Sequence, residues 1–291
     1  MRCLLAISSF LLFIALALPA SAIEQRSIYL AFGQDETVPA GSNNTGLPIT
    51  VGDEDIAFFD NKATADHSDN LASILLDDGG DQILGASLAD DILYWSLQSF
   101  SDVNVGGVVG GASDIFRATG QGSGTVSLLL DGGANAYFPD NAWIDGLTVL
   151  PDESGVYLSF WSNVTLGTNS LAVASDDVIF FDLNTFEAKM VFDYSAENPG
   201  LTAGIIALHA FNDQKFLASG LFEDEMWVLE ETAPGVWSQE LWANGETFGF
   251  PANSLDVAAM ALDSTVPEPA TLWMATLALS SLLLIGSRRL N

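Results

Sequence analysis

Acidic residues stand directly before short apolar segments at four places along the chain. They are Asp53, Asp55, Asp114, Asp176, Asp177 and Asp224. Oxygen ligands are what Ca²⁺ prefers, and the ion takes roughly six to eight of them. If the four places share one face of the fold, their carboxylates are candidates for a Ca²⁺ site. The alternative is that each aspartate accepts backbone N–H groups of its own loop, as aspartate does at turns.

Patterns typical of enzymes are weak in this sequence. The chain has two histidines, His67 and His209. His209 stands in an apolar segment, where we expect a hydrogen-bonded core histidine. His67 stands among the residue types of a catalytic triad, but sequence neighbours rarely form one. The sequence has no nucleophile elbow, phosphate loop or zinc-binding helix motif. We therefore expect a non-enzymatic protein without catalytic or cofactor-binding residues.

The alternative is an enzyme that acts on polysaccharides, for which two kinds of residue are considered. Such a hydrolase or lyase would use a pair of carboxylates facing a central channel, but with 38 acidic residues the presence of a pair carries little information. Exposed tryptophans could stack on sugars. Trp95, Trp161 and Trp227 lie within strand-like segments, however, and we expect them in the core.

The body of the chain, residues 23–265, is strongly acidic. Three of the 8 basic residues and one of the 38 acidic residues lie in the two ends, which leaves five basic and 37 acidic residues and a formal charge of about −32. Such a surface repels nucleic acid and attracts divalent cations. The many tryptophan, phenylalanine and aliphatic residues argue for a folded domain and against disorder.

Short β-rich segments separated by Gly, Asp, Asn and Pro predict an all-β domain. They recur in the same order with a period of about sixty residues, which indicates internal repeats. The corresponding segments are 27–32, 53–60 and 71–76; 83–88, 92–97, 113–117 and 124–131; 144–152, 155–162, 175–182 and 186–193; and 204–209, 215–220, 225–229 and 236–242.

The two ends of the body are incomplete in a complementary way. The first unit lacks its first segment, and residues 255–262 supply an additional first segment after the last unit. A circular array closes in this way and removes exposed sheet edges. We therefore predict a four-bladed β-propeller closed by the C-terminal strand, with a β-sandwich as the alternative. The repeats also resemble a class of bacterial surface-protein β-repeats without an assigned activity, through Asp-Gly-Leu at 145–147, Leu-Ser-Phe at 158–160 and Asp-Glu-Asp-Ile at 53–56.

The N-terminal end has the organisation of a secretion signal. Arg2 precedes an apolar run at 4–18, which is shorter than the roughly twenty residues of a membrane span. Pro19 and the small residues at 20–22 follow, so we predict a signal peptide over residues 1–22 that signal peptidase removes. Cys3, the one cysteine, would leave with it, and the mature protein would have no disulfides or thiolate sites.

The C-terminal end combines three elements in order. They are the motif Val266, Pro267, Glu268 and Pro269, an apolar stretch at 270–286, and the pair Arg288 and Arg289. The stretch is long enough for a transmembrane helix, and basic residues beside a span favour the cytoplasmic side. Together they resemble the PEP-CTERM sorting signal of Gram-negative and related bacteria, which an exosortase recognises and removes. The resemblance covers residues 266–291.

These ends imply an address for the protein. We expect an exported protein of the cell envelope, cell surface or extracellular matrix of a Gram-negative-type bacterium. Its partners would be signal peptidase and exosortase, the membrane through the helix before processing, and exopolysaccharide or other surface components, but not nucleic acid. The body would be a binding or structural β-repeat domain.

Overall fold

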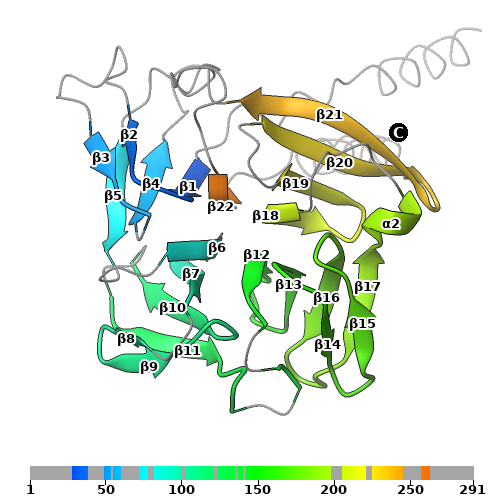
Figure 1. Ribbon diagram of the computed structural model, residues 1–291, viewed down its shortest axis with the longest axis horizontal. Coiled ribbons are helices and arrows are strands. Elements are labelled where there is room, and N and C mark those ends of the chain that lie inside the picture. Colours follow the sequence, from blue (N-terminus) through cyan, green and yellow to red (C-terminus); the bar gives the residue numbers. More distant parts are fainter. Residues whose placement is uncertain are drawn as a thin grey trace, which may run out of the picture. The chain divides into compact units, whose positions relative to one another are not determined.

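The strands of the computed structural model form four antiparallel sheets of four strands each, arranged as the blades of a β-propeller (Figure 1). The structure describes residues 28–38, 49–53, 55–59, 72–77, 82–99, 103–120, 124–134, 137–139, 142–197, 205–220, 225–244 and 257–262. All of them belong to one compact unit, residues 26–265. The propeller prediction is confirmed, and the β-sandwich alternative is not the fold.

The blades follow the predicted repeats. Blade 1 has the strand order β22 (Val257–Leu262), β1 (Ile28–Phe32), β4 (Asp55–Phe59) and β5 (Ala72–Asp77). Blade 2 has the order β6 (Gln82–Ala89), β7 (Ile92–Gln98), β10 (Ile115–Thr119) and β11 (Val126–Leu130). Blade 3 has the order β12 (Ile144–Val149), β13 (Gly155–Phe160), β16 (Val178–Asp182) and β17 (Ala188–Phe192). Blade 4 has the order β18 (Ile205–Asn212), β19 (Lys215–Gly220), β20 (Glu225–Ala233) and β21 (Val236–Asn244).

The C-terminal strand closes the ring as the sequence predicted. β22 pairs with β1 in an antiparallel register from Ile28↔Leu262 to Phe32↔Val257. The innermost strands then contact one another in a cycle, β22 to β6, β6 to β12, β12 to β18 and β18 to β22 (Figure 1). The closure gives blade 1 its fourth strand, so β1 is not left as a sheet edge of the kind that promotes aggregation.

Three small hairpins were not foreseen from the sequence. They are β2 (Glu36–Val38) with β3 (Ile49–Val51), β8 (Val103–Val105) with β9 (Val108–Gly110), and β14 (Val164–Leu166) with β15 (Leu171–Val173). Each connects the second and third strands of blades 1, 2 and 3. We call the side of the propeller where they attach the hairpin face, and the opposite side, with the tight turns between the first and second strands, the turn face.

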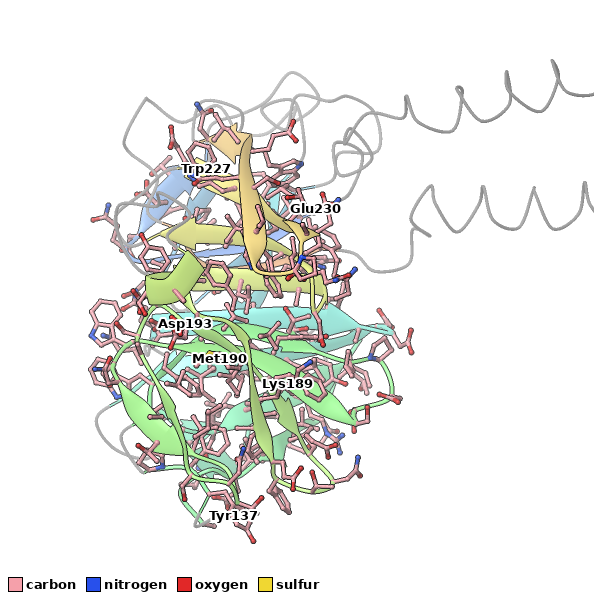
Figure 2. All side chains as sticks on the ribbon, turned by 90° about the vertical axis from the view of Figure 1, so that its right-hand side faces the viewer. Tyr137, Lys189, Met190, Asp193, Trp227 and Glu230 are labelled. Carbon is pink, nitrogen blue, oxygen red and sulfur yellow. The ribbon has the colours of Figure 1, made fainter. Side chains whose placement is uncertain are left out.

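Figure 2 shows the propeller edge-on between these two faces. Lys189 and Glu230 lie toward the turn face, and Asp193 and Trp227 lie toward the hairpin face. A single short helix of the described residues, α2 (Tyr194–Glu197), follows β17 on the hairpin face. Within the described residues, no helix is long and apolar enough to cross a bilayer. The predicted signal peptide 1–22 and the predicted sorting tail 266–291, with its helix 270–286, lie outside these residues.

The hydrophobic cores lie at the seams between blades. One cluster joins blades 1 and 2 around Trp95, a second joins blades 2 and 3 around Phe160, and a third joins blades 3 and 4 around Phe216. Burying side chains of this size is worth about 1.5–3 kcal/mol each. The blades therefore stabilise one another and not only themselves.

Each innermost strand carries a β-bulge at the same place. The bulged residues are Leu84, Asp145, Ile206 and Ala258. In blades 2 and 3 a glycine follows the bulge, because a Cβ atom at Gly85 or Gly146 would collide with a serine Oγ of the second strand. The four repeats therefore share one backbone frame, even where their sequences differ.

Candidate functional site

Three of the predicted strand-start aspartates are buried on the hairpin face. Asp55, Asp114 and Asp177 are buried at the start of the third strand of blades 1, 2 and 3. In each, Oδ2 accepts the N–H of the residue three places earlier, at 3.2, 2.7 and 2.8 Å. The backbone N–H of each aspartate donates to the carbonyl of that same earlier residue, at 3.1, 3.1 and 3.2 Å. The side chain and the backbone together form a closed turn.

The second carboxylate oxygen ties two parts of a blade together. Oδ1 of Asp114 accepts the N–H of Gly132, which follows β11, at 2.7 Å, and Oδ1 of Asp177 accepts the N–H of Tyr194, which follows β17, at 3.1 Å. Burial raises the pKa of both aspartates, and these backbone N–H groups oppose the rise. The aspartates thus link the start of the third strand to the exit of the fourth.

The structure does not gather the predicted Ca²⁺ ligands into one cluster. Asp55, Asp114 and Asp177 lie in different blades, and only Asp176 and Asp177 are neighbours. Asp53 accepts the N–H of Ile83 with its backbone carbonyl, and Asp224 lies outside the described residues. In the part of the chain that the structure describes, no three acidic or histidine side chains lie close enough to hold an ion. Capping is therefore established for three of these residues, and Ca²⁺ binding stays a prediction.

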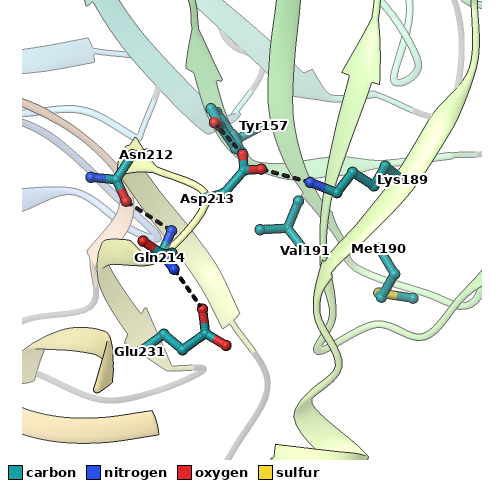
Figure 3. Close-up of a pocket in the computed structure, with 8 residues that line it drawn as sticks. All are labelled: Tyr157, Lys189, Met190, Val191, Asn212, Asp213, Gln214 and Glu231. Carbon is teal, nitrogen blue, oxygen red and sulfur yellow. Dashed lines mark hydrogen bonds and ion pairs between the residues drawn. The ribbon is translucent and has the colours of Figure 1, made fainter. Parts of the chain in front are cut away.

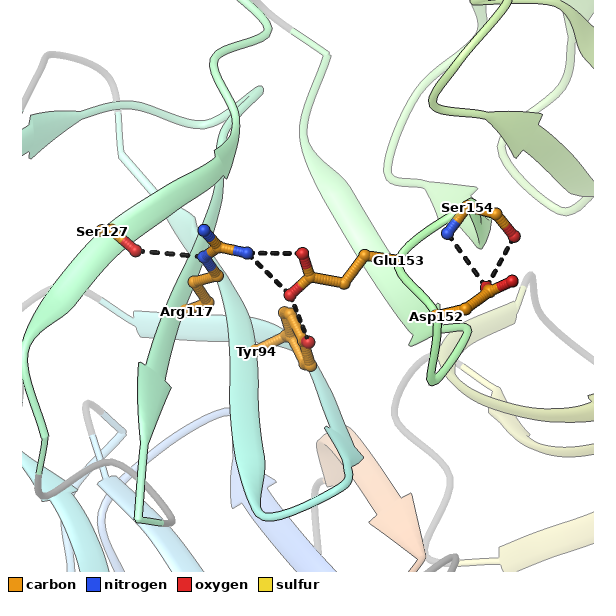
Figure 4. Close-up of polar contacts among 6 residues, drawn as sticks. All are labelled: Tyr94, Arg117, Ser127, Asp152, Glu153 and Ser154. Carbon is orange, nitrogen blue, oxygen red and sulfur yellow. Dashed lines mark hydrogen bonds and ion pairs between the residues drawn. The ribbon is translucent and has the colours of Figure 1, made fainter.

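On the turn face, a tyrosine, a carboxylate and an arginine join blades 2 and 3 (Figure 4). The Tyr94 hydroxyl donates to Oε1 of Glu153 at 2.8 Å, and Nη1 of Arg117 donates to the same oxygen at 2.7 Å. Arg117 also donates from Nε to Oγ of Ser127 at 3.1 Å. Burial raises the pKa of Glu153, but the bonds from Arg117 and Tyr94 outweigh it and hold that pKa below its usual range. Glu153 is thus ionised at the seam.

The same arrangement recurs between blades 3 and 4 (Figure 3). The Tyr157 hydroxyl donates to Oδ1 of Asp213 at 2.7 Å, and Nζ of Lys189 donates to Oδ2 at 2.6 Å. In both seams the tyrosine comes from a second strand and the carboxylate from the next blade's first turn. The cation comes from the third strand in blade 2 and from the fourth strand in blade 3, so the two are related but not identical.

A cleft of about 550 Å³ opens beside this second cluster. Its polar lining includes Lys189 and Asp213, and Gln214, which donates from Nε2 to Oε2 of Glu231 at 3.1 Å (Figure 3). Met190 and Val191 supply the apolar part. The volume lies in the range of small-molecule sites.

The protonation states at the cleft suit binding better than proton transfer. Burial and the bond to Asp213 raise the pKa of Tyr157, so its hydroxyl stays protonated and cannot act as a base near neutral pH. Burial raises the pKa of Asp213, but the bonds from Lys189 and Tyr157 outweigh it and hold that pKa below its usual range, so Asp213 is ionised near neutral pH and does not serve as an acid. The cleft therefore offers fixed donors and acceptors.

The propeller centre is held by side chains that bridge successive innermost strands. Oγ of Ser87 accepts the N–H of Val149 at 2.9 Å, and Oγ1 of Thr148 accepts the N–H of Ala210 at 2.8 Å. Nδ1 of His209 accepts the N–H of Leu262 at 3.4 Å. His209 is buried, so the prediction of a hydrogen-bonded core histidine is confirmed. His67 lies outside the described residues.

The tryptophans divide between core and surface. Trp95 is fully buried, as predicted, and Trp227 packs partly buried against the core of blades 3 and 4. The prediction of a core position for Trp161 was wrong, because it follows the last residue of β13 and is 40% exposed. No protein-family model and no curated protein matches this chain, so the PEP-CTERM resemblance and the surface-repeat resemblance stay predictions.

Proposed function

We propose that this chain is an exported protein of the cell surface or extracellular matrix, sorted and processed by an exosortase, whose propeller has a non-catalytic binding or structural role. The sorting half of the proposal is supported by the ordered motif at 266–269, the apolar stretch at 270–286 and the two terminal arginines. Signal peptidase and exosortase would then be its processing partners.

The burial of the innermost strands is the observation that carries the non-catalytic half. The innermost strands β6, β12, β18 and β22 are buried along nearly their whole length. The polar side chains Ser87, Thr148 and His209 accept hydrogen bonds from the next blade. A hydrolase or lyase of the kind considered as the alternative needs two carboxylates facing an open channel. The described innermost strands carry one acidic residue, the buried Asp145, and otherwise apolar and bridging groups, so they do not supply such a pair.

Four carboxylates, two on each face, are held in hydrogen bonds or ion pairs, which supports the same proposal. Asp114 and Asp177 bind backbone N–H groups, and Glu153 and Asp213 are paired with a tyrosine and a cation. Groups held in this way fix blades in place and present a rigid surface. A rigid surface of repeated blades is well suited to contacts with other envelope components.

Intact-mass analysis tests the sorting half. The full-length chain is expressed in a bacterium that has an exosortase and in the same strain without it. We expect the mass to lose residues 1–22 in both strains, and the segment beyond the Pro-Glu-Pro motif only where the exosortase is present. Glu268→Ala should keep the tail. A tail that survives with the exosortase present would contradict the proposal and favour a plain membrane anchor.

A reducing-end assay tests the non-catalytic half. The same purified protein is incubated with neutral and acidic polysaccharides, and new chain ends are measured. We expect none above the level of a heat-denatured sample. Release of chain ends that depends on Glu153 or Asp213 would instead favour the hydrolase alternative.

A further inference from the structure

Two tryptophans form a pair on the hairpin face of blade 3. Trp143 precedes β12, and Trp161 follows β13. Their ring centroids lie 6.3 Å apart with an interplanar angle of 48°. The N–H of Trp161 donates to the carbonyl of Trp143 at 3.1 Å. This bond extends the β12–β13 ladder by one step beyond the Ile144↔Phe160 pair, so both indoles stand on a rigid sheet end.

Trp161 is exposed and Trp143 is only half-buried, although the fold has apolar seams that bury aromatic rings. Phe160, the neighbour of Trp161, is fully buried, whereas Trp161 is 40% exposed and Trp143 is half-buried. Burying a large apolar side chain stabilises a fold, so an exposed indole forgoes stability. Adjacent aromatic rings that keep part of their surface exposed on a rigid support are typical of recognition surfaces.

Polar side chains follow Trp161 along the chain. Asn163 is exposed two residues after Trp161, and its Oδ1 accepts the N–H of Ser175 at 3.1 Å, which holds the side chain in place. Asp176 follows Ser175 in the loop between β15 and β16 and is half-buried. An amide and a carboxylate beside a flat apolar ring can bind hydroxyl groups while the ring packs against C–H groups. A sugar ring presents both kinds of group, with hydroxyls at its edge and C–H groups on its faces.

The charge of the chain selects among sugars. The body has a formal charge of about −32. Each of the three basic residues in the described part of the chain, Arg117, Lys189 and Lys215, is already in an ion pair. Anionic polysaccharides would be repelled by the acidic surface, and neutral ones would not be.

We propose that Trp143 and Trp161 form a stacking platform for a neutral polysaccharide chain. This proposal rests on the binding role proposed above, for which it names the class of ligand. Because the two rings are tilted by 48°, consecutive sugar units must be rotated relative to one another to stack on both. A single twisted chain fits this geometry, and a flat crystalline array does not.

Affinity electrophoresis of the full-length protein in detergent tests the platform. Native gels contain soluble starch, mixed-linkage β-glucan or galactomannan as neutral polysaccharides, and alginate as the anionic one. We expect at least one neutral polysaccharide to retard the protein and alginate not to. Trp161→Ala should weaken the retardation about tenfold, and Trp161→Phe should weaken it less because an aromatic ring remains. Leu241→Ala, at a residue of β21 that is 44% exposed, is the matched control and should leave retardation unchanged.

The outcomes are distinct. Equal retardation of the wild type and Trp161→Ala would overturn the platform, and so would retardation by alginate alone or by none of the polysaccharides. Circular dichroism of each variant establishes that the propeller is folded, and Trp143→Ala provides a second loss-of-ring variant. Intact-mass analysis measures removal of the C-terminal tail and does not depend on polysaccharide binding. Failure of the platform and failure of the sorting proposal therefore give different results.

Discussion

Replacing Asp145 by leucine should stabilise the propeller. Asp145 is the bulged residue of β12 and is 1% exposed, and neither of its carboxylate oxygens has a hydrogen-bond partner. The equivalent bulges of the other blades hold Leu84, Ile206 and Ala258. The same backbone therefore accommodates an apolar side chain at this position in three blades.

The size of the expected gain in stability follows from the carboxyl group that has no hydrogen-bond partner. A buried polar group without a partner costs about 1–3 kcal/mol, and more when it is charged. Removing it should raise the free energy of unfolding by that amount. In a domain of this size the melting temperature should rise by roughly 2–4 °C for each kcal/mol.

The gain should depend on pH. Burial raises the pKa of Asp145 well above its ordinary value, so the folded protein holds this proton more tightly than the unfolded chain does. The strands that contact β12 most closely carry the titratable side chains Tyr94, Tyr157 and His209, but burial alone causes this shift. The stabilising contribution of the proton is complete below the ordinary pKa of aspartate and is lost as the pH rises toward the raised pKa. The advantage of a neutral substitute should therefore be small in acid and grow with pH.

Thermal unfolding of three variants measures this effect. Asp145→Leu and Asp145→Asn both remove the titrating group, and Asp91→Asn removes one charge at an exposed turn residue as the matched control. Melting temperatures are compared at about pH 4, near the ordinary pKa of aspartate, and at about pH 8, several units above it. If both Asp145 variants melt below the wild type by the same amount at each pH, the reasoning is refuted.

Four further predictions concern the caps, the seams and metal binding. Asp114→Ala and Asp177→Ala should each lower the free energy of unfolding by about 1–3 kcal/mol in urea titrations, because each leaves two backbone N–H groups without their acceptor; unchanged midpoints would contradict the capping role. Thr148→Val keeps the side-chain shape but removes the acceptor for Ala210, and we expect a loss of about 1–3 kcal/mol in the same titration. Arg117→Gln should cost about 1 kcal/mol or less, since the pair with Glu153 is partly exposed, and the loss should shrink in high salt. If Ca²⁺ binds the folded protein, the ion should raise the melting temperature and a chelator should reverse it; an unchanged midpoint would reject the predicted ion site.

Much of the fold could be predicted because the repeats carry it. Strand-length segments in a fixed order, and the unmatched first segment at 255–262, led to four blades and to closure by the C-terminal strand. Both are properties of local composition and order along the chain. The strand-start aspartates could be recognised for the same reason, because each stands immediately before its apolar segment.

The contacts between blades could not be predicted from local patterns. Tyr94 and Glu153 are 59 residues apart, and Tyr157 and Asp213 are 56 apart, which is close to one repeat. Aligning the repeats would place a tyrosine opposite the next unit's first turn, but nothing in the sequence marks the pair. Trp161 was misassigned because it extends the apolar run of β13 by one residue, and whether the neighbouring blade covers that step depends on tertiary packing.

The departures from the repeat are the most informative positions of this propeller. The bulge, the capping aspartate and the side-chain acceptor at the seam recur from blade to blade, and they account for how the blades hold together. Asp145 and the Trp143–Trp161 pair differ from their equivalents: apolar residues replace Asp145 in the other blades, and Gln82 and Gln98 stand where the tryptophan pair would be in blade 2. Proteins retain such departures where a site has another role. Because the backbone frame is shared, the remaining blades show what an ordinary residue does at the same place. The effect of a substitution at Asp145 or Trp161 can therefore be assigned to the side chain and not to the backbone.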